Sequence, residues 1–256
     1  KGSHCLILTG ETGSGRKSII YNLANRIASE TYAAGLKHIR LLELDMLAVV
    51  GASSGREQLI ALLKQIFAEA AAAGNVVLVI PQIHNYIGRH FGYNNIAAID
   101  ISGVLSSYTA LPNFRLIGIT TYEGWHQSIE TLPDIADLFT KIEVSPVSAD
   151  NALRVLKEEA LRREKQTGIY LPLYTLKEII KLCDYYIADL AFPQKAINLL
   201  NELLAQKGLQ AGDRGASRIL TPSEVDTFFS IKYQIPAGTA ADAEKQILLN
   251  LENLIH

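Results

Sequence analysis

The sequence contains little cysteine and carries no large excess of one charge. Its 256 residues include two cysteines, one methionine and one tryptophan, and the formal net charge is −2 at pH 7. Cys5 and Cys183 lie far apart in a predicted strand and a predicted helix, which excludes a disulfide framework and favours buried thiols in a reducing compartment. Lysine and arginine are interspersed with aspartate and glutamate, so the basic stripe of a nucleic-acid-binding protein is missing. We expect no nucleic-acid partner.

Long apolar runs are also missing. No stretch reaches the roughly 20 apolar residues that a membrane helix needs, and no signal-peptide pattern opens the sequence. We therefore expect a cytoplasmic protein without a membrane partner. Hydrophobic residues nevertheless make up 48% of the chain, which predicts one large domain with a substantial core and one smaller domain.

Short apolar segments alternate with helical patterns up to about residue 147. Strands are predicted at 5–8, 39–44, 76–80, 114–120 and 142–144, and helices at 18–33, 55–72 and 96–108. Fully apolar runs such as Val76 to Ile80 suit a parallel sheet that is buried on both faces. The pattern predicts a three-layer α/β domain over residues 1–147.

Helical patterns dominate after Pro146. Helices are predicted at 150–167, 171–183 and 193–206, which indicates a small helical domain over residues 148–207. Residues 208–256 are interpreted as a linker with further helices, of which one begins at a capping sequence from Thr221 to Glu224. Another, at 240–255, is amphipathic and needs a partner surface.

A glycine-rich turn follows the first predicted strand, in the segment LTGETGSGRKSII from Leu8 to Ile20. The phosphate-binding pattern is G-x-x-x-x-G-K-[S/T], in which backbone amides cradle phosphates, the lysine reaches them and the hydroxyl holds Mg²⁺. Gly10 and Gly15 keep this spacing, but Arg16 replaces the lysine and Lys17 replaces the hydroxyl. An ammonium about 4 Å from Mg²⁺ would be repelled by about 8 kcal/mol at an effective dielectric constant of about 20, so we expect poor Mg²⁺ binding and no metal site.

Six segments resemble the Clp chaperone and unfoldase branch of the AAA+ ATPases, specifically the first of its two ATPase modules. The glycine loop and helix of that family resemble GETGSGRKSIIYNLANRI, its next strand resembles LLELDMLAVV, and its acidic strand resembles GNVVLVIPQIHNYIG. Its sensor strand resembles LIGITTYEGW, and its small-domain helix pair resembles YIADLAFPQKAINLLNE. Its connector resembles LTPSEVDTFFSIKYQIPAG together with EKQILLNLENLIH. The resemblance covers nearly the whole sequence. It implies a P-loop AAA+ large domain, without the upstream segment that contributes to the adenine pocket, followed by a small helical lid.

The resemblance also implies a site for ATP or ADP. The implied nucleotide contacts are Gly10, Glu11, Thr12, Gly13, Ser14, Gly15, Arg16, Lys17 and Ser18, with Leu153 and Pro193 in the small domain. In an alternative register with one inserted residue, Lys17 and Ser18 would be the phosphate lysine and the metal hydroxyl. That register places a gap before SIIYNLANRI, which follows the family without a gap only in the first register.

The catalytic positions depart from the family pattern. Pro81 and Gln82 stand where the family has Asp and Glu, and glutamine can orient a water molecule but cannot accept its proton. Thr121 retains the sensor position, so Gln82 and Thr121 are the remnant catalytic positions. Asp137 and Leu138 replace the paired arginines that reach a neighbouring subunit's site.

The pore position is altered as well. Where the family presents an aromatic residue to substrate polypeptide, the chain has Ser54, Gly55 and Arg56. His84 is interpreted as a structural hydrogen-bonding residue, and Glu43 is assigned no catalytic role.

Two hypotheses follow from the resemblance. In the first, the chain is a catalytically silent module with a structural or regulatory role in a hexameric ring of like subunits, with residual ATP or ADP binding. In the alternative, it is a slow ATPase for protein unfolding or disaggregation, in which Arg16 holds the phosphates and Gln82 orients water. Protein clients, a protease partner and a second ATPase module beyond His256 are implied by the same resemblance.

Overall fold

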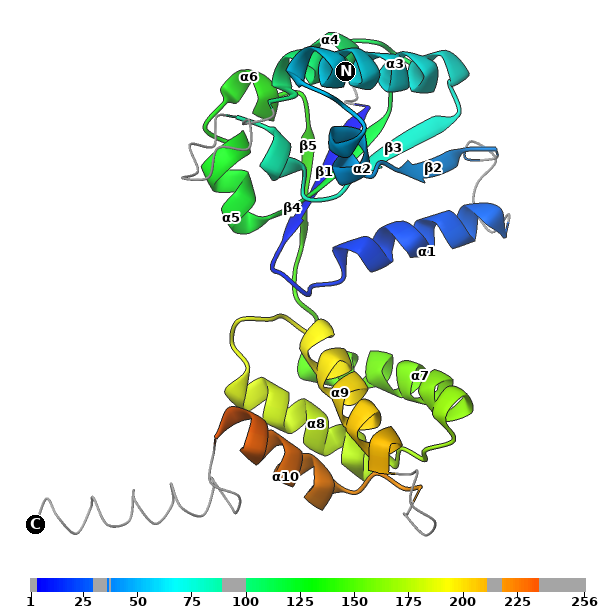
Figure 1. Cartoon of the computed structure of the whole chain (residues 1–256), viewed down its shortest axis with the longest axis vertical. Coiled ribbons are helices and arrows are strands. Elements are labelled where there is room, and N and C mark those ends of the chain that lie inside the picture. The colour runs from blue at the N-terminus through cyan, green and yellow to red at the C-terminus, as the bar shows by residue number, and fades with distance from the viewer. Residues whose placement is uncertain (1–3, 30–35, 37, 89–99, 211–217, 235–256) are drawn as a thin grey trace, which may run out of the picture. The chain divides into compact units, whose positions relative to one another are not determined.

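The computed structural model describes residues 4–29, 36, 38–88, 100–210 and 218–234. The chain divides into two compact units, Lys1–Pro146 and Val147–His256. The first contains a five-stranded sheet with helices around it, and the second is helical, so the predicted fold class is confirmed (Figure 1). Residues 30–33 and 96–99 of two predicted helices lie outside the described residues. So do residues 211–217 and 235–256 of the predicted linker segment, which include the predicted helix at 240–255.

The sheet of the first unit is entirely parallel. Its strand order is β2 (Arg40–Glu43), β3 (Val76–Ile80), β4 (Leu116–Thr121), β1 (Cys5–Gly10) and β5 (Thr140–Val144). In this register Gly10 lies opposite Thr121 on one side and Val144 on the other. The loops that follow β1, β4 and β5 therefore leave the sheet at one edge, where ligands of open α/β sheets usually bind.

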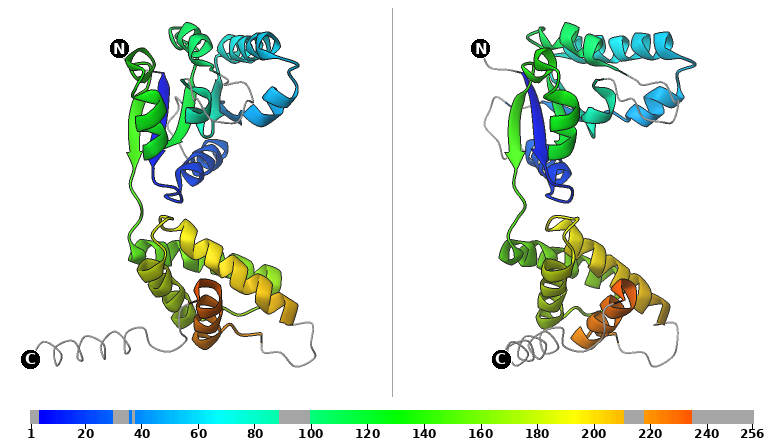
Figure 2. Two further views of the ribbon diagram at one scale, coloured as in Figure 1. Left: turned by 60° about the vertical axis from the view of Figure 1, so that its left-hand side comes forward. Right: turned by 90° about the vertical axis from the view of Figure 1, so that its left-hand side faces the viewer.

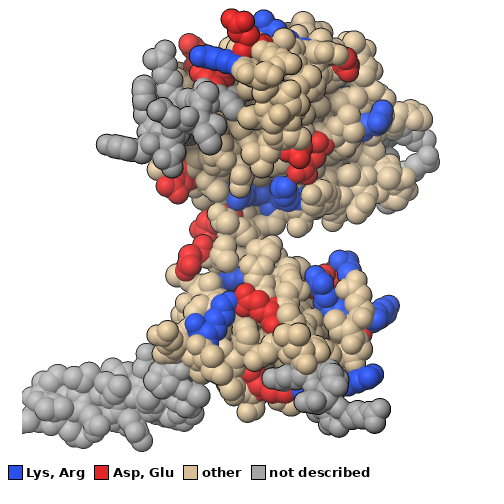
Figure 3. Space-filling model, viewed as in Figure 1, with Lys and Arg blue, Asp and Glu red and all other residues tan. Residues whose placement is uncertain are grey.

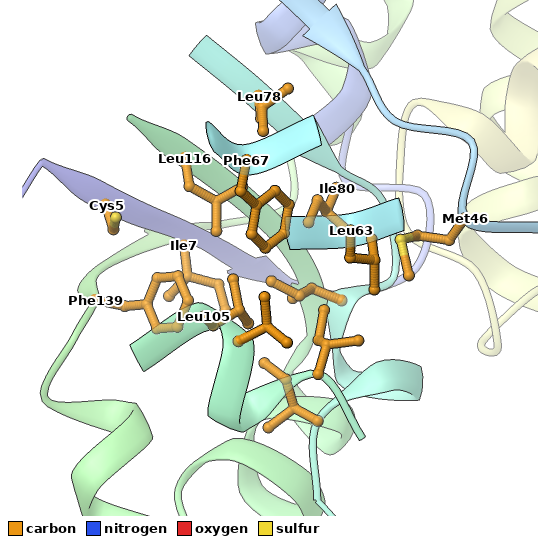
Figure 4. Packing of buried hydrophobic residues seen from close by; sticks show 14 of the residues in the cluster. Cys5, Ile7, Met46, Leu63, Phe67, Leu78, Ile80, Leu105, Leu116 and Phe139 are labelled. Carbon is orange, nitrogen blue, oxygen red and sulfur yellow. The ribbon is translucent and has the colours of Figure 1, made fainter. Parts of the chain in front are cut away.

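Side chains of β1 point alternately to the two faces of the sheet. Cys5 and Ile7 join the large core beneath α3 (Arg56–Ala73) and α4 (Ser102–Thr109), whereas Leu8 joins a smaller cluster with Ile20 of α1 (Arg16–Ala28). Burial on both faces explains why the strands have nearly continuous apolar sequences. Figure 4 shows Leu63 and Phe67 of α3 among the core side chains of β1, β3 and β4.

An aromatic cluster joins α3, α4 and the start of β4. The ring of the fully buried Phe67 lies 5.3 Å from that of Phe114 and 5.7 Å from that of Tyr108. These centroid distances lie within the usual range for tilted and edge-to-face pairs. The cluster stabilises the packing of both helices against the sheet.

Several short elements were not predicted. They are α2 (Met46–Gly51), η2 (Ile83–Tyr86), α5 (Tyr122–Gly124), the π-helix η3 (Trp125–Ile129) and α6 (Pro133–Ala136). Each is too short to show a helical hydrophobic period. A polar cap fixes the start of α2, because the amide of Ala48 donates to the Asp45 carboxylate at 3.0 Å.

The second unit contains α7 (Ala149–Thr167), α8 (Leu173–Tyr186), α9 (Gln194–Gln210) and α10 (Pro222–Tyr233) around one apolar core. Figure 2 shows these helices in two further views. The predicted capping sequence at α10 is confirmed: the Thr221 hydroxyl accepts from the Glu224 amide, and the Glu224 carboxylate accepts from the Thr221 amide. Both cysteines are buried, one in each unit, as expected.

Charged residues of both signs are distributed over the face shown in Figure 3. Within the ranges that the structure describes, no helix has the length and apolar character needed to cross a bilayer.

Candidate phosphate-binding site

The loop between β1 and α1 depends on two kinds of glycine. Gly13 and Gly15 have φ angles of 93° and 88°, in the left-handed region that side-chain-bearing residues avoid. Gly10 is required for a different reason, because a Cβ there would lie 2.5 Å from the Val144 carbonyl oxygen. The end of β1 is thus packed closely against the end of β5, and the loop that follows needs glycine at two positions for its backbone conformation.

The loop leads directly into the positive end of a helix. Gly15 is the N-cap of α1 and has no side chain with which to cap the first amides, and these amides have no acceptor within the helix. Ser14 is 5% exposed, and its Oγ has no hydrogen-bond partner in the described part of the chain. Free amides at a helix start form a ready anion site, so the loop fits a phosphate group.

Arg16 extends from the start of α1 to the end of β4. Its guanidinium donates a hydrogen bond to the Thr120 carbonyl oxygen, next to the residue that pairs with Gly10 in the sheet. Burial lowers the pKa of Arg16, but an arginine stays protonated at neutral pH. A planar donor group that can bind phosphate bidentately is therefore held beside the glycine loop.

Lys17 forms an ion pair with Glu43 at the end of β2. Lys17 Nζ lies 2.9 Å from Glu43 Oε1, and the Tyr21 hydroxyl lies 3.2 Å from Glu43 Oε2. The hydrogen bond to Glu43 raises the pKa of Lys17 above its ordinary value, which already keeps a lysine ammonium charged at neutral pH. The sequence gives no local signal for this role of Glu43, because 26 positions separate it from Lys17 and only the strand arrangement brings the two together.

Two positions at which the sequence resemblance implies Mg²⁺ contacts do not fit the ion. Lys17 offers only hydrogen-bond donors, and Pro81 has no side-chain ligand. Gln82 follows in a left-handed conformation with φ 48° and is exposed, where it accepts a 3.4 Å hydrogen bond from Asn85. The end of β3 therefore presents no carboxylate to a metal ion or to an attacking water.

The end of β4 is occupied by structural hydrogen bonds. The Thr121 hydroxyl accepts from the Gly124 amide at 2.9 Å and caps α5. His84 Nδ1 lies 2.9 Å from Thr120 Oγ1, and its ring packs so closely on Gly124 that a Cβ there would lie 2.4 Å away. His84 is thus a hydrogen-bonded packing residue, as the sequence indicated.

The structure brings together only some of the residues named from the sequence. The loop residues 10–18 and Thr121 meet at one sheet edge. Leu153 and Pro193 belong to the second unit, where both are half-buried. Asp137 is exposed after α6, and Leu138 packs against the large core.

The residues that the resemblance places at the pore position lie between α2 and α3. Ser54, Gly55 and Arg56 are exposed, and the Ser54 amide donates to Gln58 Oε1 at 2.7 Å. This turn carries no aromatic side chain.

No family model matches the chain. It is 29% identical over 255 residues to the probable ATP-dependent Clp protease ATP-binding subunit of Chlamydia pneumoniae, covering 97% of this chain and 30% of that protein. It is 31% identical over 196 residues to the negative regulator of genetic competence ClpC/MecB of Bacillus subtilis, covering 77% of this chain and 24% of that protein. The chain belongs to the Clp family of AAA+ proteins.

The fold of this Clp chain is similar to a solved structure of Hsp104 with ATPyS and FITC casein in its closed state. The TM-score is 0.79 at 21% identity, and the match covers 99% of this chain and 43% of the Hsp104 chain. The Clp chain spans less than a third of the length of the two curated relatives.

Proposed function

We propose that this Clp module binds ATP or ADP without hydrolysing it at a useful rate, and that it has a structural or regulatory role in a ring assembly. The observation that carries the proposal is the end of β3. Pro81 and the exposed, left-handed Gln82 supply neither a metal ligand nor a base at the positions where the family has Asp and Glu. Without a group that accepts the proton of water, general-base catalysis at this position is lost.

The two positions at which the family has paired arginines, known as arginine fingers, support the same proposal. Asp137 has the charge opposite to an arginine, and Leu138 is engaged in the large core. Loss of an arginine finger typically lowers phosphoryl-transfer rates by about 10³ to 10⁵. Because the finger serves a neighbouring subunit, this loss and the change at β3 affect separate requirements of the reaction.

The glycine loop supports retained nucleotide binding. Its amides, the start of α1 and the Arg16 guanidinium suit phosphates, and the small-domain residues Leu153 and Pro193 are proposed as further nucleotide contacts. The C. pneumoniae relative is named an ATP-binding subunit, and the similar Hsp104 structure contains ATPyS. We do not include Mg²⁺ in the proposed site.

The proposed partners follow from the family. The partners are further copies of the subunit in a hexameric ring, protein clients, a protease and a second ATPase module beyond His256. We propose that the assembly lies in the cytoplasm. The C. pneumoniae relative is named as part of a Clp protease, and the Hsp104 structure contains casein. The turn at Ser54 and Gly55 lacks an aromatic side chain, so we assign client gripping to another module.

Titration calorimetry with ATP and ADP, together with a phosphate-release assay, tests the proposal. We expect binding without turnover, and we expect Arg16→Ala to weaken binding at least about tenfold, since a hydrogen bond to a charged group contributes about 1.5–3 kcal/mol. Replacement of the exposed Lys177 on α8 by alanine is the control and should leave affinity unchanged.

Two results would contradict the proposal. No binding at millimolar nucleotide would remove the nucleotide role. Turnover near about 1 s⁻¹, the low end of ordinary enzyme rates, would favour the slow ATPase in which Arg16 holds the phosphates and Gln82 orients water.

A further inference from the structure

We infer that the site takes the nucleotide as a metal-free polyphosphate, with the Lys17 ammonium in place of the divalent cation and Glu43 as its competing partner. The inference rests on the proposed nucleotide binding. It starts from the mismatch between this site and Mg²⁺: the residue at the metal-binding hydroxyl position is itself a cation, and its ammonium forms a 2.9 Å ion pair with Glu43.

Lys17 is placed to exchange partners. It lies in the first turn of α1, directly after Arg16, so both cations begin at the end of the helix that attracts anions. Its side chain is 52% exposed and that of Glu43 is 39% exposed. An exposed ion pair of this kind contributes little to stability, and the four-carbon stem of lysine rotates freely. The ammonium can therefore leave Glu43 for a stronger anion.

Glu43 remains hydrogen-bonded when Lys17 leaves. Its second carboxylate oxygen accepts from the Tyr21 hydroxyl at 3.2 Å, and the side chain is 39% exposed to solvent. No buried charge is left unpaired, so the exchange avoids the large penalty of breaking a buried pair. Glu43 thus acts as a positioning residue that holds Lys17 aside until a phosphate arrives.

We expect Mg²⁺ to weaken the binding of ATP at this site. Metal-free ATP offers its full negative charge to Arg16, Lys17 and the helix start. A bound Mg²⁺ neutralises part of that charge and repels the ammonium beside it. Metal-free ATP should therefore bind more tightly than Mg–ATP, the reverse of the order expected for a site with a metal-binding hydroxyl.

Calorimetric titration of the full chain with ATP, in EDTA and in excess Mg²⁺, tests this inference. We expect tighter binding in EDTA. Lys17→Ser, which removes the ammonium and restores a hydroxyl, should weaken binding in EDTA about tenfold and reverse the Mg²⁺ preference. Glu43→Gln should tighten binding in EDTA by about two- to fivefold, the range that corresponds to an exposed ion pair.

Glu178→Gln is the matched control, because it breaks another exposed pair, Lys181 with Glu178, at the same 2.9 Å distance. Its affinity should equal that of the unaltered chain. Equal or tighter binding of ATP with Mg²⁺ to the unaltered chain would overturn the inference and leave the proposed nucleotide role standing. Absence of binding in both buffers would instead overturn the proposed role itself.

Discussion

Replacing Gly10 by alanine adds a methyl group where the structure has no room for one. The new Cβ would lie 2.5 Å from the Val144 carbonyl oxygen and 3.0 Å from Ser14 Oγ. Carbon–oxygen contacts in proteins are ordinarily about 3.3 Å or longer, so the end of β5 or the glycine loop must move by about 0.8 Å. Because Val144 contributes a backbone atom, rotation of a side chain cannot relieve the clash.

The expected cost is that of an overpacked core site, about 1–3 kcal/mol. For a chain of this size each kcal/mol lowers the melting temperature by about 2–4 °C, which gives a decrease of about 2–12 °C for Gly10→Ala. Differential scanning calorimetry measures this change directly. Loss of nucleotide affinity should accompany it, because the displaced backbone belongs to the proposed phosphate cradle.

Gly103→Ala is the matched control. Gly103 is exposed in α4, and no described atom lies within 4 Å of an added Cβ. The melting temperature of the Gly103→Ala variant should therefore stay the same or rise. A Gly10→Ala variant that melts within about 1 °C of the unaltered chain would refute the steric argument, given the sensitivity expected for this size.

Three further predictions concern stability and reactivity. Phe67→Ala should lower the free energy of unfolding in urea by about 3–5 kcal/mol, since it removes a fully buried ring from its contact with Phe114; a loss below about 1 kcal/mol would contradict the packing. Thr221→Ala should cost about 0.5–2 kcal/mol in the same assay, through loss of the α10 cap. Burial raises the pKa of Cys5 from 9.0 to about 11 and that of Cys183 from 9.0 to about 12, so native protein should resist iodoacetamide at pH 8, whereas the unfolded chain should react at both thiols. Thiols of the unfolded chain ionise at lower pH than the buried thiols of the native chain. Burial of the two neutral thiols should therefore contribute fully to stability below pH 9, and this contribution should fall as the pH rises toward 11 for Cys5 and 12 for Cys183. Rapid labelling of native protein would contradict this burial.

The main elements of the fold could be predicted from the sequence because their signals are local. Apolar runs such as Val76 to Ile80 identify buried strands, and the Thr221 to Glu224 spacing identifies a helix start. The short helices α2 and α6 could not be found, since four to six residues are too few to show a helical period. The sequence pattern predicts that α1 begins at residue 18, whereas it begins at Arg16, because the polar first turn resembles the loop before it.

The candidate site was predictable only in part. Glycine spacing indicates a loop that can cradle phosphate, and the charge of Lys17 argues against a neighbouring Mg²⁺. The ion pair with Glu43 depends on the place of β2 in the sheet, and the Arg16 contact with Thr120 depends on the position of β4. Such contacts arise from tertiary structure and leave no local sequence pattern. The roles assigned to Leu153 and Pro193 stay predictions.

The proposed function of this Clp module is to hold nucleotide without hydrolysing it. The most direct measurement is to incubate the chain with ATP, isolate the complex and determine by chromatography whether the bound nucleotide is ATP or ADP. The account predicts recovery of intact ATP, with no phosphate released above the buffer control. Recovery of ADP, with phosphate released at a turnover near about 1 s⁻¹, would contradict it.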